Sequence, residues 1–169
     1  MGYIQPLDWL LLPVYVVVIL IFAYNKKNKH IRHKPYYKYY IPGLLMKMFG
    51  ALCLCFIYVY YYGGGDTLNY FESSRPVVNL IFHNFGAFLR LLGGERSSDI
   101  WYSFDYTTGW PDYFRDENAF AVVRFSSIFV LLGAKLYLPS SIIVAWVTYS
   151  GVWKLYEIYV SSYQQYSKY

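Results

Sequence analysis

A long apolar stretch that ends in tyrosines, glycines and an acid constrains this chain most. From Ile41 to Tyr62 nearly every residue is apolar or aromatic, and the glycines at 63–65 follow, then Asp66. A helix that crosses the hydrocarbon core of a bilayer needs about 20 apolar residues, each adding roughly 1.5 Å. Tyrosines gather where such a helix leaves the lipid, and glycine disfavours its continuation. The stretch predicts a membrane-spanning helix with a carboxylate at its exit.

The chain carries few charges for its length. Of its 169 residues, 57% are hydrophobic and 15% charged, whereas a soluble domain usually has about 25% charged residues. The apolar residues also fall in blocks longer than a soluble core requires. The net charge of +5 is concentrated beside one predicted helix end, which indicates membrane orientation. Composition therefore predicts membrane lipids as partners, and no nucleic acid.

Four apolar blocks are predicted to be membrane-spanning helices. They lie near residues 7–24, 41–62, 119–135 and 140–159. We expect residues 1–169 to form a single transmembrane domain. The predicted fold is all-α, a polytopic transmembrane helical bundle of about four spans with an interfacial helix in a large outer loop.

The loop at residues 25–40 sets the expected orientation. Between Lys26 and Lys38 it holds six of the chain's 15 lysines and arginines, directly after the first block. Short basic loops beside spans remain in the cytoplasm. We therefore expect this loop in the cytoplasm, the N-terminus outside, and the loop at residues 63–118 on the extracytoplasmic face.

The outer loop contains the predicted interfacial helix. Residues 76–93 are mostly apolar but form too short a segment to span a bilayer easily. Four positions step by four, three and four residues and so share one narrow polar stripe: Asn79, His83, Gly86 and Arg90. A helix of this kind lies in the interface or is buried among other helices, so we expect it near the membrane plane.

Asp66 is the first candidate for chemistry. On a glycine-rich turn at the outer surface, it could act as a general base toward an acceptor hydroxyl or hold a divalent cation. The alternative is that Asp66 caps the helix that follows it. The sequence leaves both interpretations open.

Arg124 and Lys154 are charged residues within predicted spans, where charges are costly and often functional. Both are expected in the outer half of their helices, at roughly the depth of Asp66. Together they could bind a lipid-linked phosphate, with the arginine as a bidentate clamp. The alternative is that Lys154 pairs with Glu157, three residues further on.

Aromatic residues and carboxylates alternate along residues 100–116. Trp101 and Trp110 could form an apolar platform for a sugar, with Asp105 and Asp112 as acceptors for its hydroxyls. The alternative is an interfacial aromatic belt on a loop that rests on the bilayer.

Metal ligands are not predicted elsewhere in the chain. The three histidines share no ligand spacing, and the two cysteines lie two apart inside an apolar block. Two positions apart on a helix they face different directions, so we expect them to be small packing residues.

Three ordered segments carry a family resemblance. KPYYKYYIPGLLMKMFGALCLCFIYVYYYGGGDTLNYF, then FAVVRFSSIFVLLG, then YSGVWKLYEIYV, resemble the N-terminal part of a family of large multi-spanning membrane proteins in Bacteroidota. That family looks like the sugar-transfer and polymer-building proteins, the GT-C glycosyltransferases and the EpsG or O-antigen-polymerase type. The segment YYGGGDT is the most specific piece of the resemblance.

The resemblance implies a location and two functions. It implies a multi-pass protein of the bacterial inner membrane, and because such proteins continue through several more spans, a subunit or N-terminal portion of a larger assembly with other membrane subunits. The alternative it implies is glycosyl transfer or polymerisation from a polyprenyl-phosphate-linked sugar, with Asp66 as the catalytic base. Whether the chain is itself an enzyme stays open at this point.

Overall fold

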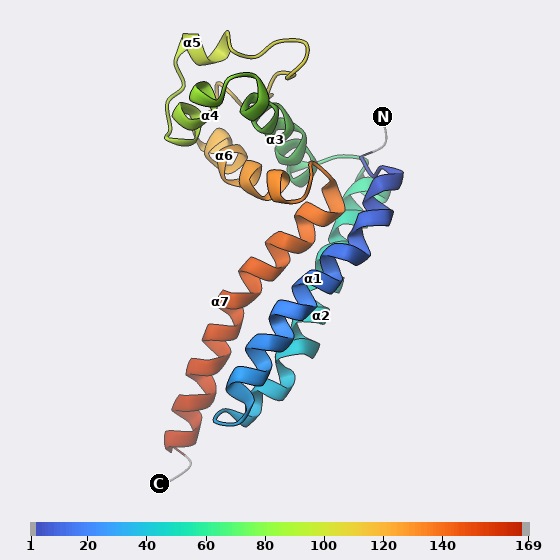
Figure 1. Cartoon of the computed structure of the whole chain (residues 1–169), viewed down its shortest axis with the longest axis vertical. Coiled ribbons are helices and arrows are strands. Elements are labelled where there is room, and N and C mark those ends of the chain that lie inside the picture. Colours follow the sequence, from blue (N-terminus) through green and yellow to red (C-terminus); the bar gives the residue numbers. More distant parts are fainter. Residues whose placement is uncertain (1–2, 167–169) are drawn as a thin grey trace.

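The computed structural model describes residues 3–166, which fold into helices and contain no strand. It shows two parts, a bundle of three long helices and a group of shorter helices at one end of it (Figure 1). We call the second part, residues 66–132, the head. The predicted all-α fold is confirmed.

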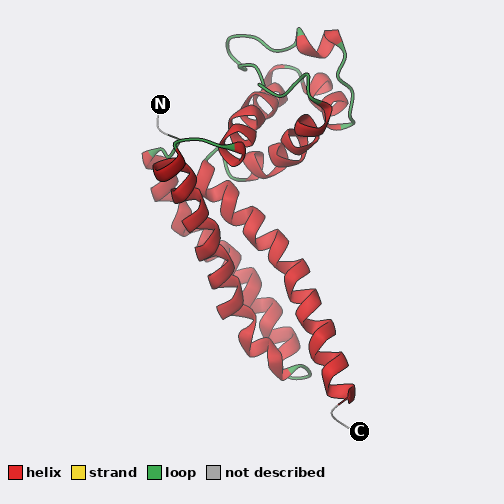
Figure 2. Ribbon diagram, turned by 180° about the vertical axis from the view of Figure 1, so that it is seen from behind, coloured by secondary structure: helices red, strands yellow, loops and turns green. Residues whose placement is uncertain are grey.

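The bundle consists of α1, α2 and α7. Its elements are α1 (Pro6–Ile31), the 3₁₀ turn η1 (Pro35–Tyr39), α2 (Tyr40–Phe56), the π-helical segment η2 (Ile57–Tyr62) and α7 (Tyr137–Tyr166). The first helix runs away from the head, α2 returns to it, and α7 runs away from it again (Figures 1 and 2). The end of α7 therefore lies beside the basic loop.

Contacts at both ends of α7 confirm its direction. At the head end the backbone N–H of Leu138 donates to Asp8 Oδ1 over 2.9 Å, which ties the start of α7 to the start of α1. At the far end Lys34 Nζ lies 3.0 Å from Glu157 Oε1. The predicted fourth span would begin at the basic-loop end of the bundle and run toward the head. Because α7 begins at the head and runs toward the basic loop, each of its ends lies at the opposite end of the bundle from the predicted one.

Two helical segments are long and apolar enough to cross a membrane, Pro6–Ile31 and Pro35–Tyr62. A third span is possible if α6 and α7 count as one broken helix, since they pass only together and bend by 107°. The expected four spans are therefore not confirmed. The block at residues 119–135 is α6 (Glu117–Leu132), which packs in the head.

A tight turn at residues 133–136 causes this bend. Ala134 and Lys135 adopt left-handed backbone angles, with φ of 56° and 60°. Gly133 allows the chain to fold back, because a Cβ there would lie 2.6 Å from the backbone nitrogen of Ser140. After this turn α7 begins at Tyr137, a few residues before the start near residue 140 that the apolar block predicted.

The head is a small helical unit with its own core. Its elements are α3 (Asp66–His83), α4 (Phe85–Leu92), α5 (Ser98–Trp101) and α6. The fully buried core residues are Val77, Leu80, Leu91, Ile100, Phe120 and Val123. The α3 and α6 helices pack side by side and carry most of this core.

Residues 76–92 are helical except at Asn84, but the single helix predicted for residues 76–93 is wrong. Pro76 lies inside α3, and the chain breaks at Asn84, which has φ of −149° and ψ of 84°. The side-chain oxygen of Asn84 accepts a hydrogen bond from the N–H of Ala87 over 3.0 Å. This is the geometry of a helix N-cap, so Asn84 ends one helix and starts the next.

Candidate binding site

A polar cleft lies in the head, between α3, the loop after α5 and the turn before α7. Its volume is about 330 Å³, within the roughly 300–1,000 Å³ of ordinary small-molecule sites. The residues that line it are Glu72, Arg75, Pro76, Asn79, Thr108, Gly109, Trp110, Asp112 and Lys135. We call it the polar cleft.

Asn79 joins the three walls of the polar cleft. It follows Glu72 and Arg75 on one face of α3, at helical spacing. Its side-chain Nδ2 donates to the carbonyl oxygen of Thr108 over 3.0 Å, and its Oδ1 accepts from Lys135 Nζ over 3.2 Å. One amide thus holds the loop and the turn against the helix.

The loop wall is shaped by Asp105. Its Oδ1 accepts hydrogen bonds from the backbone N–H groups of Thr107 and Thr108, over 2.8 and 2.9 Å. The Thr107 hydroxyl and these N–H groups lower the pKa of Asp105 to about 2. Gly109 follows with φ of 78°. These bonds fix the loop that carries Trp110, so Asp105 serves as a turn former, not as an acceptor in the cleft.

Only some of the charged side chains of the polar cleft form ion pairs. Arg75 Nη1 lies 3.5 Å from Glu72 Oε2, and both side chains are partly exposed. Lys135 makes no ion pair with any carboxylate of residues 3–166 and contacts Asn79 instead. Trp110 is 42% exposed. The cleft therefore combines Lys135, which has no carboxylate partner among the described residues, and Arg75, which is paired at 3.5 Å, with two carboxylates and an aromatic face. The cations can bind an anionic group, and the aromatic face and carboxylates suit an attached sugar or similar ring.

An apolar groove lies where α3 and α6 meet the bundle. It also has a volume of about 330 Å³. The residues that line it are Ala51, Leu54, Cys55, Tyr58, Thr67, Tyr70, Phe71, Ser126, Phe129, Val130, Tyr137, Ser140, Ser141 and Val144. We call it the apolar groove. Its lining is that of a site for a hydrocarbon chain.

Arg75 connects the two cavities. Its guanidinium carbon lies 5.9 Å from the centre of the Phe71 ring, and Phe71 lines the apolar groove. On the other side, Lys135 of the polar cleft and Tyr137 of the groove lie two residues apart in the chain. The two cavities are thus neighbours across α3 and across the turn before α7.

Of the predicted sugar-binding tryptophans, the structure places only Trp110 in the polar cleft. Trp101 is half-buried against the core of the head, with its ring centre 5.0 Å from that of Phe114. Asp112, one of the predicted hydroxyl acceptors, does line the cleft.

Arg124 lines neither cavity. Its Nε is buried without a hydrogen-bond partner among the described residues. Its guanidinium lies against the backbone of Gly94, where a Cβ would come within 2.8 Å of Nη1. The structure therefore places Arg124 beside the turn after α4.

Lys154 lies at the opposite end of the bundle from the head. Its Nζ is 3.3 Å from Glu157 Oε2, and Glu157 also pairs with Lys34 of the basic loop. The pairing of Lys154 with Glu157 is confirmed. The expectation that Lys154 shares the level of Asp66 is wrong, because α7 runs from the head toward the basic loop.

Asp66 is exposed at the first position of α3 and lines neither cavity. The N-cap is Gly65, with no side-chain cap bond, so the expectation that Asp66 caps the helix is wrong. In the first turn its charge is still favoured by the helix dipole. Within residues 3–166, no group of three or more His, Cys, Asp or Glu side chains lies close enough together to bind one metal ion.

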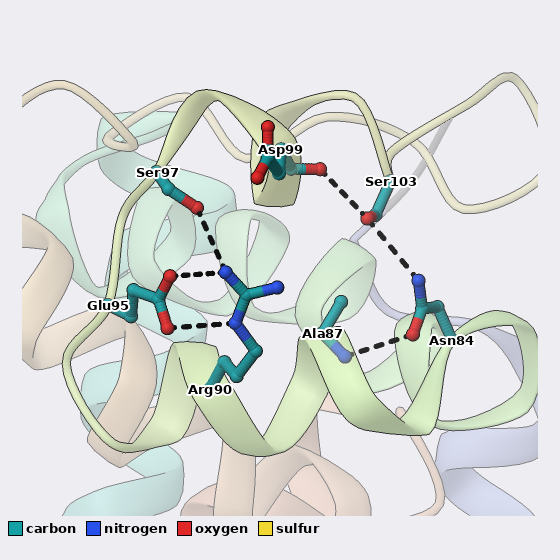
Figure 3. Close-up of polar contacts among 7 residues, drawn as sticks. All are labelled: Asn84, Ala87, Arg90, Glu95, Ser97, Asp99 and Ser103. Carbon is teal, nitrogen blue, oxygen red and sulfur yellow. Dashed lines mark hydrogen bonds and ion pairs between the residues drawn. The ribbon is translucent and has the colours of Figure 1, made fainter.

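The break at Asn84 also separates the predicted polar stripe. Arg90, on α4, donates from Nε to Glu95 Oε2 over 2.8 Å and makes a second contact to Oε1 (Figure 3). Ser97 Oγ lies 3.5 Å from Arg90 Nη2. This pair lowers the pKa of Glu95 and fixes the connection from α4 to α5. Arg90 is therefore structural, and only Asn79 of the stripe reaches the polar cleft.

Glu72, Arg75 and Lys135 are cleft residues that sequence reasoning missed. The spacing of Glu72, Arg75 and Asn79 on one helix face was a usable signal, once the helix is known to begin at Asp66. Lys135 gave none, because its place depends on the left-handed turn.

Comparison of the chain with protein-family models, with curated proteins and with solved structures gives no match. The function proposed below therefore relies on the geometry of the cavities.

Proposed function

We propose that this chain is an integral membrane protein that holds an amphiphilic anionic molecule, with its polar end in the polar cleft and its hydrocarbon chain in the apolar groove. The observation that carries the proposal is the position of Arg75. It lines the cleft while its guanidinium lies 5.9 Å from the Phe71 ring of the groove. A molecule with a charged head and a long apolar chain fits such a pair of cavities.

The surface of the bundle supports a membrane location. Along α1, large apolar side chains are each between 45% and 67% exposed: Leu7, Trp9, Leu10, Val14, Val17, Val18, Ile21 and Phe22. In water this surface would be unfavourable, whereas lipid tails solvate it. The basic loop and the head lie at opposite ends of α1 and α2 (Figure 2), which agrees with a cytoplasmic loop and an outer head.

The polar cleft favours a phosphate linked to a sugar. Lys135 and Arg75 supply charge for phosphate oxygens, and Arg can bind two of them at once. Trp110 offers a face for a sugar ring and Asp112 an acceptor for its hydroxyls. Together with the resemblance to sugar-transfer proteins, this chemistry makes a polyprenyl-phosphate-linked sugar our proposed ligand, bound by a subunit or N-terminal portion of a larger inner-membrane assembly.

Glycosyl transfer is the second candidate function. It is favoured by two carboxylates, Glu72 and Asp112, that line the cleft with Trp110. A general base must come within hydrogen-bond reach of the acceptor hydroxyl. Glu72 and Asp112 are therefore the candidate bases within the cleft, whereas Asp66 lies outside it.

Lipid retention tests the binding proposal. The protein is reconstituted in nanodiscs with equal amounts of polyprenyl phosphate and uncharged polyprenol, and retained lipid is measured by native mass spectrometry. We expect selective retention of the phosphate, and a loss of that selectivity on the order of tenfold in Lys135→Ala, since a hydrogen bond to a charged group is removed. Lys154→Ala is the matched control, because Lys154 lies far from the cleft and pairs with Glu157.

The groove is tested separately. Val144 lines the apolar groove, so Val144→Trp should fill it and reduce retention of both lipids. Val152, also on α7 and 51% exposed, gives the control Val152→Trp. Equal retention in Lys135→Ala and Lys154→Ala, or in the two tryptophan variants, would refute the proposed site.

A further inference from the structure

The helix α6 has two apolar faces, of which the head uses one. Phe120, Val123 and Val130 are buried against α3 and its neighbours. The other face is exposed. Its apolar residues recur at intervals of three and four positions, as on one side of a helix: Val122, Phe125, Ile128 and Leu132. We call this set the α6 stripe.

The α6 stripe is strongly exposed. Phe125 is 64% accessible and Leu132 is 56% accessible. Between residues 119 and 132 the only charged residue is Arg124, whose Nε is buried away from solvent. An apolar helix face of this kind, without charges, is unfavourable in water.

The direction of α6 relates this face to the membrane. The bend between α6 and α7 is 107°, and α7 runs alongside α1 and α2 in the bundle. When the bundle crosses a bilayer, a helix turned by this angle lies close to the membrane plane. Figure 1 shows α6 on the side of the head toward the bundle, with α5 on the far side.

We propose that α6 is an interfacial helix whose stripe is embedded in the bilayer surface. The partner is lipid, because the stripe ends at Leu132 and exposed apolar residues resume on α7 with Val147, Val152 and Leu155. A helix of this type buries its apolar face about 5–10 Å into the boundary between headgroups and acyl chains. The interfacial helix is thus α6, not the segment at residues 76–93.

The inference is independent of the proposed ligand. It concerns only where the head sits, and it holds whether or not the polar cleft binds a phosphate. In this arrangement α6 lies at the membrane surface and does not cross the bilayer.

Spin labels test this placement. Single cysteines for a nitroxide are introduced at Phe125 and Ile128, in a Cys53→Ala, Cys55→Ala background, and the protein is reconstituted in nanodiscs of phosphatidylethanolamine and phosphatidylglycerol. Collision rates are measured with oxygen, which concentrates in lipid, and with a nickel chelate, which stays in water. We expect the ratio of oxygen to nickel collisions to be several-fold higher at these positions than at control positions in water.

The controls come from the same head. Glu117 begins α6 with an 81% exposed side chain, and Tyr106 in the loop is 95% exposed. Both should favour the nickel chelate. Helical circular dichroism identifies variants that fail to fold, and a label at Val122 then replaces the one lost.

Two results would overturn the inference. The first is an oxygen-to-nickel ratio at Phe125 equal to that at Tyr106, which would place the stripe in water. The second is dipolar broadening between labels at Phe125 that rises with the ratio of protein to lipid, which would show a second copy of the chain on the stripe.

Discussion

Two charges, Glu157 at the basic end of the bundle and Lys135 at the head end, have different surroundings. At the basic end, Glu157 is only 7% exposed and is matched by two lysines of the chain itself, Lys34 and Lys154. At the head end, Lys135 has no such partner among the described residues and Arg124 has a buried, unbonded Nε. A charge that the chain satisfies stabilises the structure, whereas one left open at the edge of a cavity is available to a ligand. Lys135, which lines the polar cleft, is therefore a charge that a ligand can use.

Aromatic packing accompanies the matched charges at the basic end. Tyr37, Tyr40, Tyr149 and Trp153 are each at most 4% exposed. The rings of Tyr40 and Trp153 meet edge to face with centres 4.9 Å apart, and the Tyr149 hydroxyl donates to the Tyr40 carbonyl over 2.8 Å. This end of the bundle has the features of a structural anchor.

The largest expected effect comes from removing that anchor. Trp153→Ala should lower the free energy of unfolding by about 3–5 kcal/mol, because a buried aromatic side chain leaves a cavity. Denaturation in detergent, followed by circular dichroism, measures the loss. Tyr159→Ala on the same helix is the control, since Tyr159 is 67% exposed. Equal stability of both variants would contradict the role of the basic end.

The head end depends on a single buried carboxylate. Asp8 is fully buried, and its two oxygens accept from the N–H groups of Leu138 and Gln5, both over 2.9 Å. Asp8→Ala should cost about 1–3 kcal/mol, because the buried N–H of Leu138 and the partly buried N–H of Gln5 lose their acceptor. Asp8→Asn keeps one acceptor oxygen and should recover part of the loss. Amide exchange at Leu138 reports this directly, and unchanged protection in Asp8→Ala would show that the bond does not hold α7.

Asp66 gives a smaller effect. The variant Asp66→Asn should lower stability by only about 0.3–1 kcal/mol, the value of a charge in the first turn of a helix. Because Asp66 lines neither cavity, we expect little change in transfer of sugar from a polyprenyl-phosphate donor. A fall in that activity of about 10²–10⁴-fold, with the fold intact, would establish Asp66 as a general base.

The smallest expected effect is a change in the conformation of the loop that carries Asp105 and Trp110 as the pH falls. The pKa of Asp105 is lowered from 3.8 to about 2, first by the Thr107 hydroxyl and then by backbone N–H groups. The stabilisation is therefore complete above about pH 4 and is lost as pH falls through about 2. Fluorescence of Trp110, isolated by comparison with Trp110→Phe, should change in that window. In Thr107→Ala the midpoint should move to higher pH, and an unmoved midpoint would exclude the hydroxyl as the cause.

The sequence was sufficient for the bundle's first two helices and insufficient for the head. Apolar blocks near 7–24 and 41–62 are long enough to define spans by themselves. By contrast α6 is as apolar as a span but has 16 residues, about 24 Å at 1.5 Å each against a core of about 30 Å. Its assignment depends on packing against α3, which composition does not report.

The residues of the polar cleft also differ in how well the sequence predicted them. Trp110 and Asp112 were predicted because aromatic and acidic residues alternate locally, and both line the polar cleft. Arg75 and Lys135 were not, since they are 60 positions apart and meet only through the left-handed turn at residues 134–135. Local patterns predict what one segment presents, whereas a cleft requires segments to converge.

The π-helical segment Ile57–Tyr62 affects the direction in which the chain leaves α2 and enters the head. A π turn accommodates an additional residue within a helix, and one residue corresponds to about 100° of rotation. The backbone that enters the glycine turn at residues 63–65 is therefore rotated about the helix axis relative to an uninterrupted α-helix of the same length. The π segment and the glycine turn at residues 63–65 together set the direction in which the chain enters the head, so an insertion or deletion in η2 would rotate this exit as well as shift it along the helix axis.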